Sequence, residues 1–297
     1  MAQAPRIPVI LCIDAEPDGF FIDRRRSDPW LGYERSVEFF RRFRDRLQPS
    51  GERARFTWCY RMDPQVAETY GAAEWVARHY ETITAQLIGD GDELGLHAHG
   101  YRWEAAAGAW TVDHGNQSWI DHTVRTSFAA FERAFGERCR TFRFGDRWMS
   151  NGTVRLLAEL GTRHDLTLEP GHPALDSYHP GRSSGSLPDY TDLPVDPYRP
   201  SPDDFRRPAR DGSGGLWLIP LTTAPSEGSI AQEVVLQDVQ AGRGRGCLDR
   251  ARQPRPAALP PDRRTCARSL LAALPGAGAQ IQRPGHAPAR QTRLGQS

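Results

Sequence analysis

The sequence predicts an α/β protein built around a parallel sheet. Short apolar, β-branched segments alternate at least four times with segments whose apolar residues recur at helical spacing. Strand–helix–strand units of this kind are right-handed and bring their strands into one parallel sheet, either open or closed into a barrel. The length of 297 residues, with 38% hydrophobic and 25% charged residues, is enough for one large domain with a packed core.

The first half of the chain supplies the clearest alternation. The segment 7–16 is a β-branched apolar run between two prolines, as expected for a strand that is buried on both faces. The segment 34–47 repeats apolar residues every three or four positions and predicts a helix. Three more elements follow from the same two patterns: a strand at 54–62, a helix at 72–88 and a strand at 92–99.

The second half continues this order as far as residue 170. A helix at 118–136 ends on Gly136, and a helix at 153–161 ends on Gly161, because glycine suits the residue that closes a helix. The remaining predicted strands are short and apolar, at 139–145, 164–170 and 216–222. Between the last two, residues 171–215 are rich in Pro, Gly, Asp and Ser and predict a long active-site loop or an insertion.

The composition changes after residue 240. Residues 241–297 contain no Phe, Trp or Tyr, and they carry 11 Arg against 2 acidic residues. Such a segment cannot build a packed core, so we expect a folded domain at 1–240 and a disordered tail at 241–297 that trypsin removes early. The tail fits either a basic extension or a GC-rich gene read out of frame.

Charge and residue usage exclude several classes of function. With 38 basic and 37 acidic residues, the net charge of +1 indicates neither a nucleic-acid nor a membrane partner. All the basic residues are arginine, which excludes Schiff-base lysines and P-loops. The five cysteines form no CxxC pair, and no apolar run approaches the roughly 18 residues of a membrane span. Since the N-terminal segment lacks a basic region and a cleavage site, we expect a cytoplasmic protein.

Polar residues gather where the predicted strands end. Because the carboxyl ends of parallel strands meet on one rim, these side chains are expected to surround a ligand site. They are Asp14 and Glu16 after the first strand, Arg61 and Asp63 after the second, His97 and His99 after the third, Arg143 and Asp146 after the fourth, and Glu169 after the fifth.

Two of these pairs have the spacing of metal ligands. Asp14 and Glu16 are two residues apart in a strand, as are His97 and His99, so each pair points to one face. Two imidazoles and one carboxylate form the usual ligand set of a catalytic divalent ion with an open position for water. The second carboxylate would then be free to act as a base.

The same residues resemble motifs of the polysaccharide deacetylases of the NodB-homology type. The segment CIDAEPD is similar to the first motif, which implies Asp14 as catalytic base and Glu16 as metal ligand. The segment GDELGLHAHGY is similar to the second, with His97 and His99 as ligands, although the usual second histidine position falls on Tyr101.

A third segment, FRFGDRW, is similar to the motif in which an arginine orients the base, here Arg143, and an aromatic residue, here Trp148, forms a wall. The resemblance covers about residues 6–222. It implies a distorted (β/α) barrel and a metal-dependent hydrolase that removes acetyl groups from an N-acetylated carbohydrate, and we expect zinc as the metal. The Leu-x-x-His motif, whose histidine is the family's general acid, is not recognisable.

Several alternatives stay open at this point. The same strand-end chemistry suits an amide or imide hydrolase for a small non-sugar substrate, and the missing acid suits a non-catalytic remnant. A glycosidase with a carboxylate pair has little need of the two histidines. The candidate substrate-binding residues are Trp103, Asp146, Trp148, Glu169 and His172, of which His172 is also a candidate acid.

Overall fold

The structure is a computed structural model, and it describes residues 9–222 except 20, 23, 25–28, 52, 178, 180, 211 and 213. The predicted tail at 241–297 and the first eight residues of the predicted domain lie outside the described residues. Within the described part, no helix has the length and apolar character that crossing a membrane requires.

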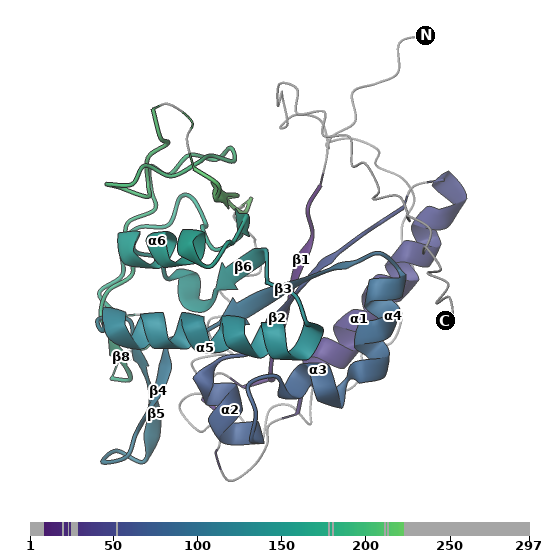
Figure 1. The fold of residues 1–297 in the computed structure, drawn as a ribbon, viewed down its shortest axis with the longest axis horizontal. Coiled ribbons are helices and arrows are strands. Elements are labelled where there is room, and N and C mark those ends of the chain that lie inside the picture. The colour runs from purple at the N-terminus through teal and green to yellow at the C-terminus, as the bar shows by residue number, and fades with distance from the viewer. Residues whose placement is uncertain are drawn as a thin grey trace, which may run out of the picture. The chain divides into compact units, whose positions relative to one another are not determined.

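A six-stranded parallel sheet forms the centre, and its strands are hydrogen-bonded in the order in which they occur along the chain (Figure 1). Each strand therefore lies next to the one that a single right-handed connection can reach. The α/β class expected from the alternation is thus confirmed. The strands are β1 (Cys12–Ala15), β2 (Thr57–Arg61), β3 (Glu93–Ala98), β6 (Thr141–Phe144), β7 (His164–Asp165) and β9 (Trp217–Leu218).

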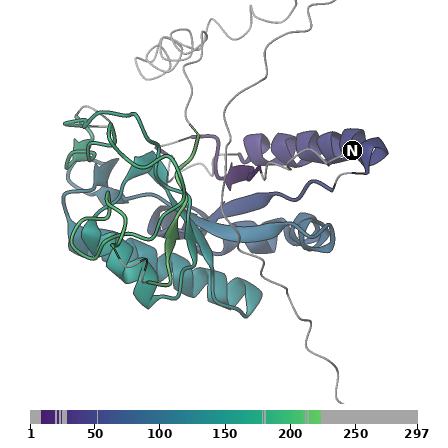
Figure 2. The ribbon, with the colours of Figure 1, turned by 90° about the horizontal axis from the view of Figure 1, so that it is seen from above.

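Helices cover the outside of this sheet. Since the strand order equals the chain order, right-handed connections place every helix on the same face, and Figure 2 shows the helices around the outside of the strands. The other face is left for the interior. The helices are α1 (Leu31–Leu47), α2 (Pro64–Tyr70), α3 (Trp75–His79), α4 (Glu81–Gly89), α5 (Gln117–Phe135) and α6 (Asn151–Glu159).

The ends of the helices follow from local side-chain chemistry. Asp63 accepts a hydrogen bond from the Val66 amide at the start of α2, and Ser150 accepts one from the Thr153 amide at the start of α6. Gly136 ends α5 in the left-handed region, as its position predicted. The single helix predicted at 72–88 is instead two helices, α3 and α4, because the backbone leaves the helical region at Tyr80.

A hairpin that the sequence patterns did not predict follows the third strand. It consists of β4 (Tyr101–Glu104) and β5 (Ala109–Asp113), and the short strand β8 (Ser183–Ser184) pairs with β5. Both hairpin strands are short, and an alanine- and glycine-rich turn joins them. The alternation of apolar and polar residues along each strand is therefore hard to recognise in the sequence. The segment 171–215 is anchored by buried Tyr190, Tyr198 and Phe205, which pack in the main core.

The core lies against β2, whose five residues are all buried. Trp58 and Tyr60 of β2 belong to the same hydrophobic cluster as Phe142 and Phe144 of β6, and all four side chains are fully buried. The indole nitrogen of Trp58 donates to the buried carboxylate of Asp92, 3.0 Å away, so burying this ring leaves no polar atom unpaired. This rigid centre fixes the positions of the strand ends that carry the polar residues.

One buried carboxyl in β7 couples stability to pH. Burial raises the pKa of Asp165 to about 7, although its hydrogen bonds from Thr167 and the charge of Arg143 act in the opposite direction. A raised carboxyl pKa stabilises the fold fully below the ordinary value near 4, and this stabilisation is lost as pH rises towards 7.

We therefore expect Asp165→Asn to flatten the pH dependence between about pH 4 and 7, by a difference on the order of 4 kcal/mol relative to the wild type. Urea denaturation at a series of pH values measures this difference. Parallel stability profiles for the two proteins would show that Asp165 titrates as an ordinary carboxyl.

Candidate active site

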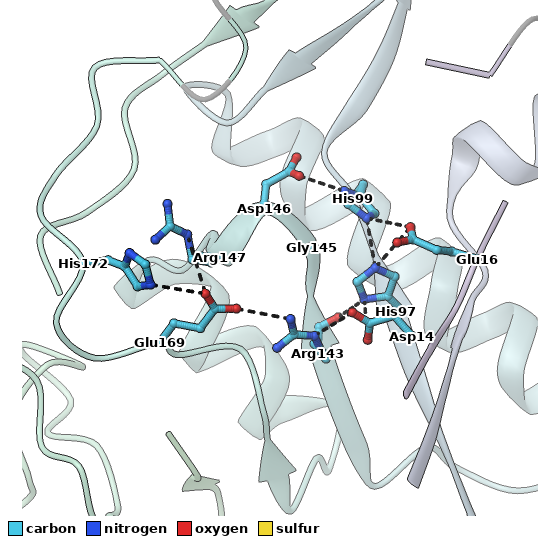
Figure 3. A pocket seen from close by; sticks show the side chains of 10 residues that line it. All are labelled: Asp14, Glu16, His97, His99, Arg143, Gly145, Asp146, Arg147, Glu169 and His172. Carbon is cyan, nitrogen blue, oxygen red and sulfur yellow. Dashed lines mark hydrogen bonds and ion pairs between the residues drawn. The ribbon is translucent and has the colours of Figure 1, made fainter. Parts of the chain in front are cut away.

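The carboxyl ends of the strands form one polar cavity. In the pairing register Arg61 of β2 lies beside His97 of β3, and His97 lies beside Arg143 of β6, so one row of residues crosses the sheet at this edge. The cavity has a volume of about 350 Å³ and is shown in Figure 3. It is lined by Asp14, Glu16, His97, His99, Arg143, Gly145, Asp146, Arg147, Glu169 and His172.

Glu16, His97 and His99 direct one atom each to a common point. The Nε2 atoms of the two histidines are 2.9 Å apart, and Glu16 Oε2 lies 3.6 Å from His97 Nε2 and 3.2 Å from His99 Nε2. A tetrahedral ion bound at about 2.0–2.2 Å separates its ligands by roughly 3.3–3.6 Å, close to these values. The three residues predicted as metal ligands are therefore brought together in a geometry that fits one divalent ion.

The ring nitrogen of each imidazole that faces away from this point lies near an oxygen atom. His97 Nδ1 lies 3.2 Å from the backbone carbonyl oxygen of Arg143, and His99 Nδ1 lies 3.3 Å from Asp146 Oδ1. Both histidines are almost completely buried. When His97 Nδ1 donates to this carbonyl oxygen, its Nε2 keeps a free lone pair, as a metal ligand requires.

The turn at Gly145–Arg147 is shaped around His99. Asp146 and Arg147 have φ values of 55° and 57°, a region that residues other than glycine rarely adopt. A Cβ atom on Gly145 would lie 2.2 Å from His99 Cε1 and 2.4 Å from both ring nitrogens. Only glycine therefore allows the turn to approach the imidazole and to place Asp146 beside it.

We expect Gly145→Ala to displace the His99 ring and to weaken zinc binding by about 10- to 100-fold or more, as loss of outer partners does in other metal sites. Zinc affinity measured by competition with a chromogenic chelator checks this. Gly89→Ala at the end of α4 is the matched control, because a Cβ there meets nothing within 4 Å. Equal affinities for the two variants would contradict the tight fit described here.

Asp14 lies beside this cluster and is held by Arg143. Arg143 Nε donates to Asp14 Oδ2 over 2.9 Å, so the predicted contact between the two side chains is present. The same guanidinium donates from Nη1 to the Leu166 carbonyl oxygen over 2.9 Å and from Nη2 to Glu169 Oε1 over 3.3 Å. Three acceptors fix the guanidinium, and Asp14 is thereby aimed into the cavity beside the histidines (Figure 3).

The charges in the cavity shift the pKa values of Glu16, His99 and Asp146. Burial acts to raise the pKa of Glu16, but hydrogen bonds and charge from His97 and His99 outweigh it and hold this pKa well below its ordinary range. Burial acts to lower the pKa of His99, but Asp146 and Glu16 raise it to about 9 against the charge of Arg61. Burial also acts to raise the pKa of Asp146, and His99 keeps it low. A divalent ion at this point would displace the proton of His99.

Arg61 belongs to the site although sequence reasoning placed it only at a strand end. It is fully buried, donates to Glu16 Oε2 over 3.3 Å and to Asp63 Oδ2 over 2.8 Å. Asp63 in turn accepts from the His99 amide over 3.0 Å. The alignment of β2 with β3 was the signal that could have located Arg61, since Arg61 pairs directly with His97.

The other predicted residues divide between the cavity and its surroundings. Asp146, Glu169 and His172 line the cavity. Trp148 is not among the lining residues, because its ring stacks on buried His114 at a centroid distance of 4.9 Å. Trp103 is in the hairpin, where its ring packs against Trp110.

Tyr101 occupies the position where the resembled motif has its second histidine. Its ring stacks on His99 with centroids 5.1 Å apart, and its hydroxyl lies 3.4 Å from His179 Nε2. Tyr101 therefore supports one face of His99, and its hydroxyl is turned to a different partner. This packing is consistent with His99, rather than residue 101, serving as the second histidine ligand.

Comparisons with known proteins give distant matches. No family profile matches the sequence, and no curated protein matches it. Among solved structures, a candidate polysaccharide deacetylase from Mycobacterium smegmatis matches at 16% identity with a TM-score of 0.33, covering 64% of this chain and 54% of that chain.

Two further solved structures match at a comparable level. BA3943 from Bacillus anthracis, described as a CE4 family pseudoenzyme, has 11% identity and a TM-score of 0.30, covering 69% of this chain and 57% of that chain. A GH57 branching enzyme from Thermococcus kodakaraensis has 14% identity and a TM-score of 0.36, covering 71% of this chain and 46% of that chain. The present chain thus spans about half the length of these proteins. Polysaccharide deacetylases, which the motifs resemble, are therefore also among the solved structures that this chain matches, at low overall similarity.

Proposed function

We propose that this chain is a metal-dependent hydrolase that removes acetyl groups from an N-acetylated carbohydrate, with zinc as its metal. The observation that carries the proposal is the convergence of three ligand atoms beside an arginine-held carboxylate in one cavity. A metal site with a free carboxylate next to it is the arrangement that hydrolysis by an activated water requires.

The donor set favours zinc. Two neutral imidazoles and one carboxylate are common ligands of catalytic zinc, and a fourth position stays open for water or substrate. A divalent ion held by Glu16, His97 and His99 would polarise the amide carbonyl and lower the pKa of a bound water.

The chain's own residues would handle the proton and the orientation. Asp14 is placed to take a proton from the attacking water, because one of its oxygens is held by Arg143 and Oδ1 has no hydrogen-bond partner among the described residues. Arg143 holds Asp14 in one orientation, since its guanidinium is itself fixed by Leu166 and Glu169.

A small amide that is not a sugar is the second candidate substrate. The cavity of about 350 Å³ lies at the lower end of the range for small-molecule pockets, which favours a ligand of limited size. The metal and Asp14 would perform the same reaction on either substrate, because hydrolysis involves only the amide group.

The test is release of acetate by zinc-supplemented protein from N-acetylglucosamine oligomers and from small N-acetylated amides. We expect release that stops when a chelator removes the metal and resumes when zinc is restored. Bound zinc without acetate release from any of these compounds would show a non-catalytic metal site.

A further inference from the structure

The half of the cavity away from the metal ligands contains a second arginine whose placement is unusual. Arg147 follows Asp146 in the tight turn, and both have a backbone φ in the left-handed region. The buried hydroxyl of Tyr190 donates to the Arg147 carbonyl oxygen over 2.7 Å and so holds the turn in place. The strained turn sends Asp146 to His99 and Arg147 to the opposite side of the cavity (Figure 3).

The guanidinium of Arg147 is enclosed but largely unpaired. Its side chain is only 15% exposed, and among the described residues its one ionic contact is from Nε to Glu169 Oε2 at 3.9 Å, longer than a hydrogen bond. Within the described part of the chain, the two Nη groups have no hydrogen-bond partner. Arg143 differs from Arg147 in this respect, because each of its three guanidinium nitrogens donates a hydrogen bond.

Arg147 and His172 both approach the carboxylate of Glu169 on the cavity wall. His172 is 42% exposed at the cavity wall, and its Nε2 lies 3.7 Å from Glu169 Oε2. Arg147 and His172 both approach Oε2 of Glu169, and Oε1 of the same carboxylate accepts a hydrogen bond from Arg143. Burial and then the charge of Arg147 act to lower the pKa of His172, while Glu169 acts to raise it.

We propose that Arg147 and His172 bind a carboxylate carried by the substrate, so that the substrate class is small N-acetylated acids. The open Nη edge of an arginine matches the two oxygens of a carboxylate, and this pairing is strongest where water is largely excluded. The inference rests on the proposed function, because it assumes that the amide lies at the metal side of the same cavity. Two sources carry this chemistry: N-acetylated amino acids and acidic N-acetyl sugars.

The experiment compares matched acid and neutral probes on zinc-supplemented protein by ligand-observed NMR titration. One pair is N-acetylglycine and N-acetylglycinamide, and the other is N-acetylmuramic acid and N-acetylglucosamine. The acid of at least one pair is expected to bind about 10-fold or more tightly than its neutral partner. The pair with the larger preference identifies the source of the carboxylate.

The variants test the assigned group. Arg147→Gln should remove the acid preference, and Arg147→Lys should keep only part of it because the planar fork is lost. Arg155→Gln on α6, which is exposed and outside the cavity, is the matched control and should behave as the wild type. In the wild type the preference should also fall as salt is added, a measurement that needs no variant.

The outcomes separate this inference from the proposed function. Equal affinity for the acid and neutral members of both pairs would overturn the carboxylate site, even if zinc-dependent acetate release is observed. An acid preference that depends on Arg147 would support the site even if no probe is hydrolysed, and in that case only the proposed function fails.

Discussion

Replacing His97 by alanine is expected to remove zinc binding almost completely. The substitution deletes one of three converging ligand atoms and leaves Glu16 and His99, whose ligand atoms lie 3.2 Å apart, as the remaining pair. The loss of affinity should exceed the roughly 10- to 100-fold effect of removing an outer partner of a metal ligand. Metal analysis of purified protein after zinc supplementation and dialysis measures it, with about one zinc per wild-type chain expected.

The matched control is His122→Ala, an exposed histidine on α5 that stacks on Trp119 outside the cavity. It should leave the zinc content unchanged. Thermal denaturation with and without zinc adds a second readout, since a ligand that binds only the folded state raises its stability. Zinc content near zero in the wild type, or undiminished zinc in His97→Ala, would contradict the assigned site.

Asp14→Asn is expected to retain zinc and to lose hydrolysis. The amide has nearly the shape of the carboxylate but cannot take a proton from water, so the rate should fall by about 10²- to 10⁴-fold. The hydrogen bond from Arg143 Nε can still be accepted by the amide oxygen, so the cavity should keep its geometry. Acetate release and zinc content measured on the same preparation separate the two effects.

Asp45→Asn is the control for this substitution, because Asp45 is exposed on α1 and does not line the active cavity. It should hydrolyse the same substrates at the wild-type rate. If Asp14→Asn retained full activity with its zinc, another group would have to serve as the base. If it lost its zinc, Asp14 would belong to the metal ligands.

Two parts of the fold could not be predicted correctly from the sequence, because their local patterns are weak or ambiguous. The helix predicted at 72–88 is divided at Tyr80, whose ring packs on Tyr33 with centroids 5.1 Å apart. The apolar spacing of the sequence continues through Tyr80, so helical periodicity alone could not predict this break. The hairpin β4–β5 was missed because each of its strands is short and its third partner, β8, comes from the segment 171–215.

The sequence by itself determined the α/β class and the candidate ligands, because both depend on short-range rules. Strand–helix alternation sets the sheet, and a spacing of two residues puts Asp14 with Glu16 and His97 with His99 on common faces. The structure places these four side chains in one cavity. Their chemistry could be anticipated because imidazoles and carboxylates at strand ends have few other uses in combination.

Only the tertiary structure decided which residues support and extend this site. Gly145 and Arg147 carry no local signal of their role, and Gly145 acts through a close approach to a ring 46 positions earlier in the chain. Arg61 was expected at the rim, but only its register beside His97 links it to the candidate ligands. Trp103 and Trp148 are aromatic residues of the kind that line sugar-binding sites. The ring of Trp103 nevertheless packs against Trp110, and the ring of Trp148 stacks on His114. The direction of a side chain such as Trp103 or Trp148 is set by packing between segments that are distant in the sequence. The sequence alone does not show which of these segments lie close together in space.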